Sequence, residues 1–244
     1  DLSTAVLAVP DFFKLLRNTL ILSLYNLVIT FPMPIILALA VNELKSKAYK
    51  KVVQMVTYLP YFISTVVLVG TMKNIFSPRT GLINNIIALF GGPQTDFMGN
   101  PDLFRTMYVW SGVWQGMGYS AVIYIAALAN VDSAQVEASL MDGAGRFARV
   151  WHVDLPAILP TIVIQLILAV GSVMSLGYEK VFLMQNPVNT EVSEVISTFV
   201  YKRGIAGFQY SYAAAVGLFN SVVNLVLIAL ANVFAKKVGE TSLW

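Results

Sequence analysis

The 244-residue sequence contains no cysteine and very few charged residues. Without cysteine, the chain has no disulfide framework and no thiol chemistry. Charged residues make up 12% of the sequence and hydrophobic residues 57%. In soluble domains, about a quarter of all residues are charged. The net charge of +3 is spread over several connections and forms no basic stripe of the kind that nucleic-acid binding needs. The composition therefore indicates a polytopic membrane protein.

The sequence also lacks the groups that enzymes and nucleotide-binding proteins use. It contains no phosphate-binding loop of the G-x-x-x-x-G-K-[ST] type, so we do not expect the chain to bind ATP. Its one histidine, His152, cannot form a metal site alone. We expect no catalytic residues, no metal site and no cofactor bound by this chain.

Apolar stretches long enough to cross a bilayer recur along the chain and predict an all-α membrane protein. We expect residues 1–244 to form a single transmembrane domain, with Pro60 interrupting the second span. The five predicted spans cover residues 18–41, 52–72, 106–130, 157–176 and 211–235. None of them contains an Asp, Glu, Lys, Arg or His residue, which argues against an ion-driven transporter.

The connections between the spans differ in length, and this difference predicts the orientation. Two long polar connections, residues 73–105 and 177–210, alternate with shorter ones that hold an equal number of Lys and Arg residues. The positive-inside rule gives most weight to short loops. We therefore expect the loop 131–156 and the C-terminus to lie in the cytoplasm.

The loop 131–156 contains its own helix signals. Asp132 and Ser133 are suitable N-caps, Val136 and Leu140 share one helix face, and Gly143 is suited to a left-handed turn. Residues 146–153 can form a second short helix, which we expect to stop before Pro156. The loop is therefore predicted to be a projecting helix–turn–helix element to which a soluble partner protein can bind.

The same residues resemble the EAA loop of permease subunits of bacterial ABC importers, whose pattern is E-A-A, D-G-A, a hydrophobic residue and L-P. Ser139 stands where the family usually has Ala, and Val153 replaces the commoner Ile. Further stretches, such as YLPYFIS and WQGMGYSAVIYIAALANVD, resemble the sugar-permease branch, and more narrowly LplB-type oligosaccharide permeases. Members of this branch usually have one more span, which we expect ahead of Asp1.

The resemblance implies a type I ABC importer permease fold in the bacterial inner membrane. The implied partners are a second permease subunit that is a different chain, two cytoplasmic ATPases that bind ATP and Mg, and an extracytoplasmic sugar-binding protein. The loop helix would be the coupling helix, with polar contacts from Glu137 and Asp142 and an apolar anchor from Val136 and Leu140. The residues that the resemblance assigns to ATPase coupling are Val136, Glu137, Ala138, Ser139, Leu140, Asp142, Gly143, Ala144, Phe147, Leu155 and Pro156.

Uncharged polar and aromatic residues inside the predicted spans are candidates for the sugar pathway. Aromatic faces cover the C–H patches of sugars, and amides bond their hydroxyl groups. The alternative is that amides join neighbouring helices and that aromatic rings lie at the membrane interface. The pathway candidates are Tyr25, Asn26, Trp110, Trp114, Gln115, Tyr119, Asn220 and Asn224.

Two other functions are compatible with a polytopic chain. A facilitator for neutral solutes would transport without an ATPase and would tolerate substitution around Glu137. A membrane-embedded enzyme or assembly scaffold would need a cluster of reactive residues, and the predicted spans contain none. Import of a sugar through an ATP-driven assembly therefore remains the favoured hypothesis.

Overall fold

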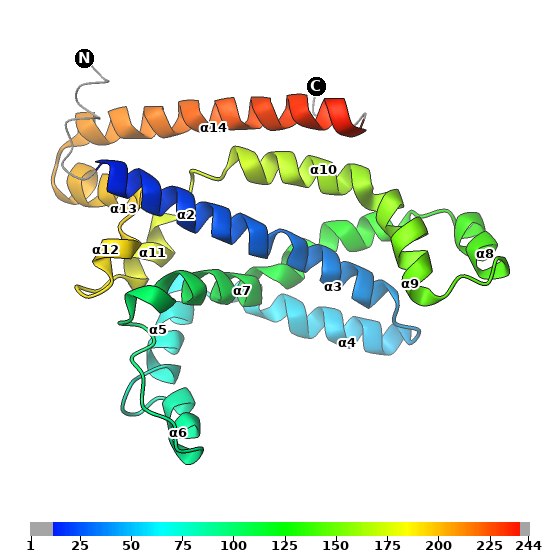
Figure 1. The fold of residues 1–244 in the computed structure, drawn as a ribbon, viewed down its shortest axis with the longest axis horizontal. Helices are drawn as coiled ribbons and strands as arrows, with labels where there is room; N and C mark the ends of the chain where they lie inside the picture. Colours follow the sequence, from blue (N-terminus) through cyan, green and yellow to red (C-terminus); the bar gives the residue numbers. More distant parts are fainter. Residues whose placement is uncertain (1–11, 240–244) are drawn as a thin grey trace. The chain divides into compact units, whose positions relative to one another are not determined.

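The structure, a computed structural model, describes residues 12–239, and all regular structure within this range is helical. This confirms the predicted all-α class (Figure 1). The α-helices are α2 Phe12–Thr30, α3 Pro32–Asn42, α4 Lys47–Tyr58, α5 Thr65–Ile75, α6 Leu82–Leu89, α7 Pro101–Ala129, α8 Ser133–Met141, α9 Arg146–Arg149, α10 Leu155–Gly171, α11 Tyr178–Met184, α12 Thr190–Ser193, α13 Ile196–Val200 and α14 Tyr210–Gly239. A 3-10 turn covers Leu59–Phe62, and π-helical segments cover Val150–Asp154 and Tyr201–Ala206.

The chain divides into two compact units. Unit 1 contains the described residues up to Leu27, Ile63–Ser111 and Ser172–Val226, and unit 2 contains Val28–Phe62, Gly112–Gly171 and the chain from Leu227. The boundaries between units fall at 27/28, 62/63, 111/112, 171/172 and 226/227, which makes five crossings. Each crossing lies inside one of the five predicted spans. Unit 1 therefore holds both long connections, and unit 2 holds the basic turn 42–51 and the loop 131–156.

Within residues 12–239, three helical segments are long and apolar enough to cross a membrane, namely Phe12–Asn42, Arg146–Gly171 and Tyr210–Lys237. A fourth is added if the broken pair α4–α5 counts as one span. The predicted number of five spans is therefore not confirmed. The third predicted span is helical throughout as part of α7, but α7 is not among the sufficiently apolar segments, because it carries Trp, Tyr, Gln and Gly residues along its length.

The second predicted span differs from a single interrupted helix. It consists of α4 and α5, separated by the 3-10 turn Leu59–Phe62 that contains Pro60. Proline has no N–H to donate and its ring clashes with the preceding turn. Ser64 then starts α5 as an N-cap, its hydroxyl oxygen accepting from the Val67 N–H at 3.3 Å. Helix α4 therefore ends and α5 begins as a separate helix with its own N-cap. The position of Pro60 alone did not predict two separate helices.

In unit 1, the connection 177–210 is fixed to the first helix by polar side chains. Asn18 donates from Nδ2 to the Glu191 carbonyl at 2.9 Å, and the Ile196 N–H donates to Thr19 Oγ1 at 2.9 Å. Both α2 side chains are buried. In the same unit, α11 packs against α5 and α13.

Unit 2 has an apolar core built from three helices. Its buried members come from α3, α7 and α10: Ile35, Ala38, Ala121, Tyr124, Leu128 and Ile158. A second close contact joins α4 to α7, where Gly118 lies against the backbone of Thr57. The start of α10, which carries the loop of α8 and α9, is therefore anchored in this core through Ile158.

Candidate functional site: the loop of α8 and α9

Helix α8 begins as the sequence predicts. Asp132 has an extended backbone conformation, and its carboxylate Oδ1 accepts a hydrogen bond from the Ala134 N–H at 2.9 Å. This bond satisfies one of the free amides of the first turn. The prediction that Asp132 is an N-cap is confirmed.

Helix α8 ends in a left-handed turn at Gly143, whose φ is +76°. The Ala144 N–H donates to the Ser139 carbonyl at 2.9 Å, and the Gly143 N–H donates to the Leu140 carbonyl at 3.1 Å. This pair of bonds is the Schellman motif, which needs a residue that tolerates positive φ at the position of Gly143. The predicted role of Gly143 in the turn is confirmed.

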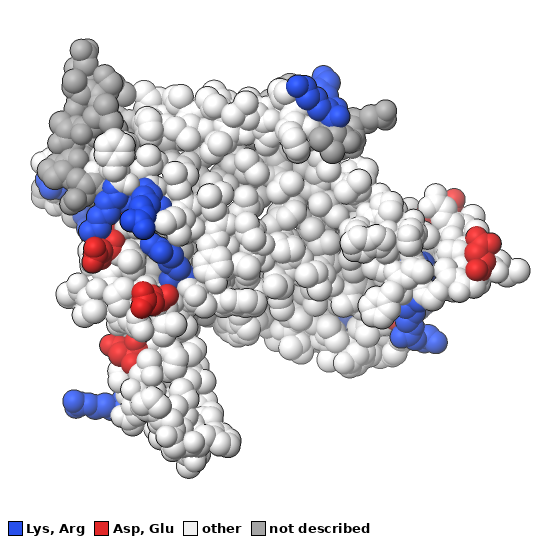
Figure 2. Space-filling view, in the orientation of Figure 1, with Lys and Arg blue, Asp and Glu red and all other residues white. Residues whose placement is uncertain are grey.

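The loop exposes large apolar side chains. Met141 is 88% exposed and Phe147 is 94% exposed, and Leu140 and Trp151 are exposed as well. Exposed apolar clusters rimmed by polar residues mark interaction sites. Figure 2 shows acidic side chains on the projecting α8, where Glu137 and Asp142 are exposed.

The remaining coupling candidates lie on the same loop. Val136 is half-buried, Ala138 is exposed, and the Ser139 hydroxyl donates back to the Val136 carbonyl at 2.7 Å. Leu155 and Pro156 form the first turn of α10. All eleven candidates therefore lie between the start of α8 and the first turn of α10, within unit 2.

The second short helix does not stop before Pro156, contrary to the sequence prediction. Helix α9 continues through the π-helical segment Val150–Asp154 into α10, and the helical path Arg146–Gly171 is unbroken. Proline is tolerated in the first turn of a helix, where no N–H is required. The wider π turn lets the chain pass Pro156 without ending the helix.

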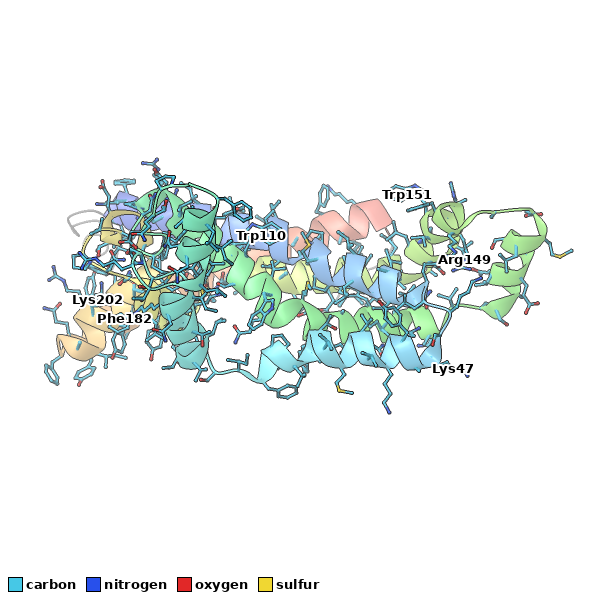
Figure 3. All side chains as sticks on the ribbon, turned by 90° about the horizontal axis from the view of Figure 1, so that it is seen from below. Lys47, Trp110, Arg149, Trp151, Phe182 and Lys202 are labelled. Atoms are coloured by element: carbon cyan, nitrogen blue, oxygen red, sulfur yellow. The ribbon has the colours of Figure 1, made fainter. Side chains whose placement is uncertain are left out.

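A cluster of three charged residues lies at the base of the loop and was not predicted from the sequence. The Arg149 guanidinium donates from one terminal nitrogen to Glu43 Oε1, and its Nε lies 3.7 Å from Asp154 Oδ2. The Asp154 side chain is only 4% exposed. Figure 3 shows Arg149 at the same end of unit 2 as Lys47 and Trp151. Glu43 and Arg149 are 106 residues apart, so no local pattern indicated their contact.

The pathway candidates on α2 and α7 differ in exposure. Tyr25 and Asn26 of α2 and Gln115 of α7 are half-buried. Trp110 and Trp114 are about half exposed. Tyr119 stacks on Tyr61 with ring centroids 3.9 Å apart and an interplanar angle of 7°, so Tyr61 joins the aromatic residues that unit 2 presents.

Asn220 and Asn224 of α14 hold the turn that follows α10. Asn220 donates to the Met174 carbonyl at 3.2 Å. Asn224 accepts from the Met174 N–H at 3.2 Å and donates to Ser175 Oγ at 2.7 Å. These are the contacts expected of amides that join neighbouring segments.

A lysine from the connection 177–210 contacts α7 within unit 1. The Lys180 ammonium donates to the Tyr108 carbonyl at 2.9 Å and lies 4.7 Å from the centre of the Tyr108 ring. Burial lowers the pKa of the Lys180 ammonium to about 8, because the charged form loses water. The sequence showed no charge inside the third predicted span, yet this cation reaches it from α11.

Comparisons with known proteins agree on one family. Residues 30–240 match the family described as "Binding-protein-dependent transport system inner membrane component". Protein LplB of Bacillus subtilis (strain 168) is 46% identical over 235 residues, which cover 96% of this chain and 74% of LplB. The polygalacturonan/rhamnogalacturonan transport system permease protein YteP of the same organism is 45% identical and is covered over 73% of its length.

A solved structure has the same fold. A chain in the crystal structure of a bacterial alginate ABC transporter, in complex with a periplasmic protein bound to alginate pentasaccharide, superposes with a TM-score of 0.96 at 37% identity. The match covers 100% of this chain and 84% of that chain. The chain therefore belongs to the family of binding-protein-dependent transport system inner membrane components, and it is a membrane permease of an ABC importer.

Proposed function

We propose that this chain is the membrane-spanning permease subunit of an ATP-driven, binding-protein-dependent importer for oligosaccharides. It forms half of the translocation pathway and is coupled to a separate ATPase through α8. The observation that carries the coupling role is the loop itself, in which a capped helix with exposed apolar side chains ends in a fixed turn. The names of YteP and of the alginate transporter support an oligosaccharide as the substrate class.

The chemistry of the loop suits a groove on a soluble partner. Leu140, Met141 and Phe147 offer apolar area that becomes buried on docking, and Glu137 and Asp142 offer charge-assisted hydrogen bonds at the rim. The Schellman turn keeps α8 at a defined angle to the following chain. A rigid helix that enters a groove can transmit a displacement, whereas a flexible loop would absorb it.

The topology that we propose has five spans, with the loop of α8 and α9 and the C-terminus in the cytoplasm. It is supported by the five crossings between units, one inside each predicted span. The grouping of the connections also supports it. The two connections assigned to the outside, 73–105 and 177–210, both belong to unit 1, and the two assigned to the cytoplasm, 42–51 and 131–156, both belong to unit 2. The partners in this proposal are a second permease chain, a pair of cytoplasmic ATPases that bind ATP and Mg, and an extracytoplasmic binding protein.

Co-purification tests this proposal directly. The affinity-tagged chain is extracted from membranes of its native cell with mild detergent, and the chains that accompany it are identified. We expect an ATPase and a second permease, and an ATP hydrolysis rate that rises when a binding protein loaded with oligosaccharide is added. Recovery of the chain alone, with solute transport in vesicles that contain no ATP, would instead establish a facilitator.

A further inference from the structure

The coupling loop has limited contact with the rest of unit 2. Helix α8 packs against the π-helical segment Val150–Asp154, and that segment packs against α9 and α10. A displacement of α8 reaches the other helices through the chain on either side of it: α7 through residues 130–132, and α10 through the stretch between Arg146 and Leu155. The side chains that fix this short stretch to its neighbours decide how much of the displacement is passed on.

The cluster of Glu43, Arg149 and Asp154 fixes this stretch to α3. Glu43 is the C-cap residue of α3, and its N–H donates to the carbonyls of Leu39 and Val41. The Glu43 carboxylate is therefore attached to the end of α3 by a short side chain. Arg149 is the last residue of α9, and Asp154 is the last residue of the π-helical segment. One guanidinium thus bridges α3 to both ends of the segment that carries α8.

The three side chains of the cluster are largely shielded from solvent, so each charge depends on its partners in the cluster. The side chains of Arg149 and Glu43 are each 19% exposed, and that of Asp154 is 4% exposed. Charges at such positions are costly to leave unpaired, and the removal of one partner exposes the others to that cost. The guanidinium donates a hydrogen bond to Glu43 and pairs electrostatically with Asp154 through its Nε at 3.7 Å, and a planar guanidinium can face two carboxylates in this way.

An apolar contact continues the same route. Four residues beyond Asp154, Ile158 of α10 lies fully buried in one cluster with Ile35 and Ala38 of α3. The end of the loop therefore contacts helix α3 at two places: at the ion cluster beside the C-terminus of α3, and in this apolar core. Helix α3 follows α2 with a break at Phe31 alone, so Glu43 lies next to the C-terminal end of the helical segment Phe12–Asn42.

We infer that Arg149 is a positioning residue of the importer: through Glu43 and Asp154 it transmits the movement of the coupling loop to α3. The inference rests on the proposed function, because it assigns the route by which α8 acts on the transport pathway. It predicts that loss of the bridge separates ATP hydrolysis from transport, while the ATPase still binds to α8.

The test uses the complete importer in proteoliposomes and measures the amount of oligosaccharide transported per ATP hydrolysed. For Arg149→Gln we expect this ratio to fall by about tenfold, the size of a typical coupling between sites, with the ATPase still present in the purified assembly. Arg146→Gln is the matched control, because Arg146 lies on the same short helix with an exposed side chain. Glu43→Gln should also lower the ratio, because Glu43 joins Arg149 to α3, but by less, because the amide oxygen of Gln can still accept from the guanidinium.

A covalent replacement of the bridge keeps the inference testable if Arg149→Gln does not assemble. The chain has no cysteine, so Glu43→Cys with Arg149→Cys can be joined by a short bis-methanethiosulfonate linker and released with reductant. We expect a low transport-to-hydrolysis ratio in the reduced variant and recovery of at least half of the lost ratio after linking. The wild-type importer receives the same treatment, which controls for cysteines in its partner chains.

The outcomes separate the two proposals. If the wild-type assembly shows no ATP-dependent transport, the proposed function itself is wrong. If the wild type is coupled, but Arg149→Gln and the reduced cysteine pair transport as much per ATP as Arg146→Gln, the role of Arg149 is overturned. A fall in ratio that the linker does not reverse also contradicts a bridge, because it assigns the loss to local misfolding.

Discussion

Gly143 is the residue at which the coupling loop depends most on a single backbone conformation. Its φ is +76° and the position of its missing Cβ is surrounded by open space, so strain in the backbone is the one effect of a small substituent. An L-residue in this conformation costs roughly 1–2 kcal/mol, and a β-branched residue costs more. Gly145, two residues on, has the same open space and a φ of −71°.

We therefore expect Gly143→Val to reduce ATPase co-purification and oligosaccharide uptake by about tenfold, which corresponds to the strain in the turn. Gly145→Ala should leave both nearly unchanged, and Gly143→Asn should be intermediate because Asn tolerates a left-handed conformation. Uptake is measured in cells, and the amount of chain in the membrane is measured by immunoblot. Equal behaviour of the Gly143→Val and Gly145→Ala variants would contradict the importance of the turn.

The difference between Asp132 or Gly143 and Arg149 shows what can be read from single residues in this sequence. An N-cap and a Schellman turn involve partners within five residues, so their chemistry is visible in the local order of residue types. The bridge from Arg149 to Glu43 spans 106 residues, and it forms because α3 and α10 share a core. Sequence alone gives no sign of such pairing, and for the same reason it did not indicate the contact of Lys180 with Tyr108.

The helices that are defined by a long apolar stretch were predicted well from the sequence. The helix ends near proline residues were predicted less well. The long helices α2–α3, α10 and α14 cover the first, fourth and fifth predicted spans, with ends that differ by several residues. Pro60 marked an interruption, but the separate N-cap by Ser64 made it a break between two helices. Pro156 marked a stop, but it lies where a helix needs no N–H from it.

Helix α7 provides a test of packing at the level of elements. A Cβ on Gly118 would lie 2.0 Å from the Thr57 carbonyl oxygen of α4, whereas a Cβ on Gly116 would meet no atom within 4 Å. Because the atom in contact at Gly118 belongs to the backbone, the two helices must separate to accept a side chain. Overpacking of this kind costs typically about 1–3 kcal/mol.

We expect Gly118→Ala to lower the thermal unfolding midpoint of the purified protein in detergent by a few degrees, on the scale of about 2–4 °C for each kcal/mol in chains of roughly 150–250 residues. Gly116→Ala should leave the midpoint unchanged or raise it slightly, because Ala loses less backbone freedom than Gly in a helix. The two variants have the same chemical change on the same helix of unit 2. If both shift the midpoint equally, helix propensity and not the α4–α7 contact sets the effect.

At the scale of the whole molecule, the number of spans remains a prediction, and its basis is connectivity. Three or four segments of the described part of the chain meet the criterion of length and apolarity, yet the chain passes between its two units five times. The discrepancy lies in α4–α5, which is broken, and in α7, which is less apolar because of its Trp, Tyr and Gln residues. Polar and aromatic residues in a membrane helix are tolerated when they face a partner helix or a pathway. Apolarity alone therefore does not decide the number of spans of this chain, and five spans stay a prediction.

The absence of cysteine allows this topology to be measured directly. Single cysteines are introduced at four exposed positions, Lys47 and Phe147 in unit 2 and Phe90 and Val188 in unit 1. A membrane-impermeant thiol reagent should label Phe90→Cys and Val188→Cys from outside intact cells, and Lys47→Cys and Phe147→Cys only in inverted vesicles. If α4–α5 does not cross the membrane, Lys47→Cys and Phe90→Cys will be labelled from the same side. If α7 does not cross, Phe90→Cys and Phe147→Cys will share a side, so each failure of the five-span topology has its own labelling pattern.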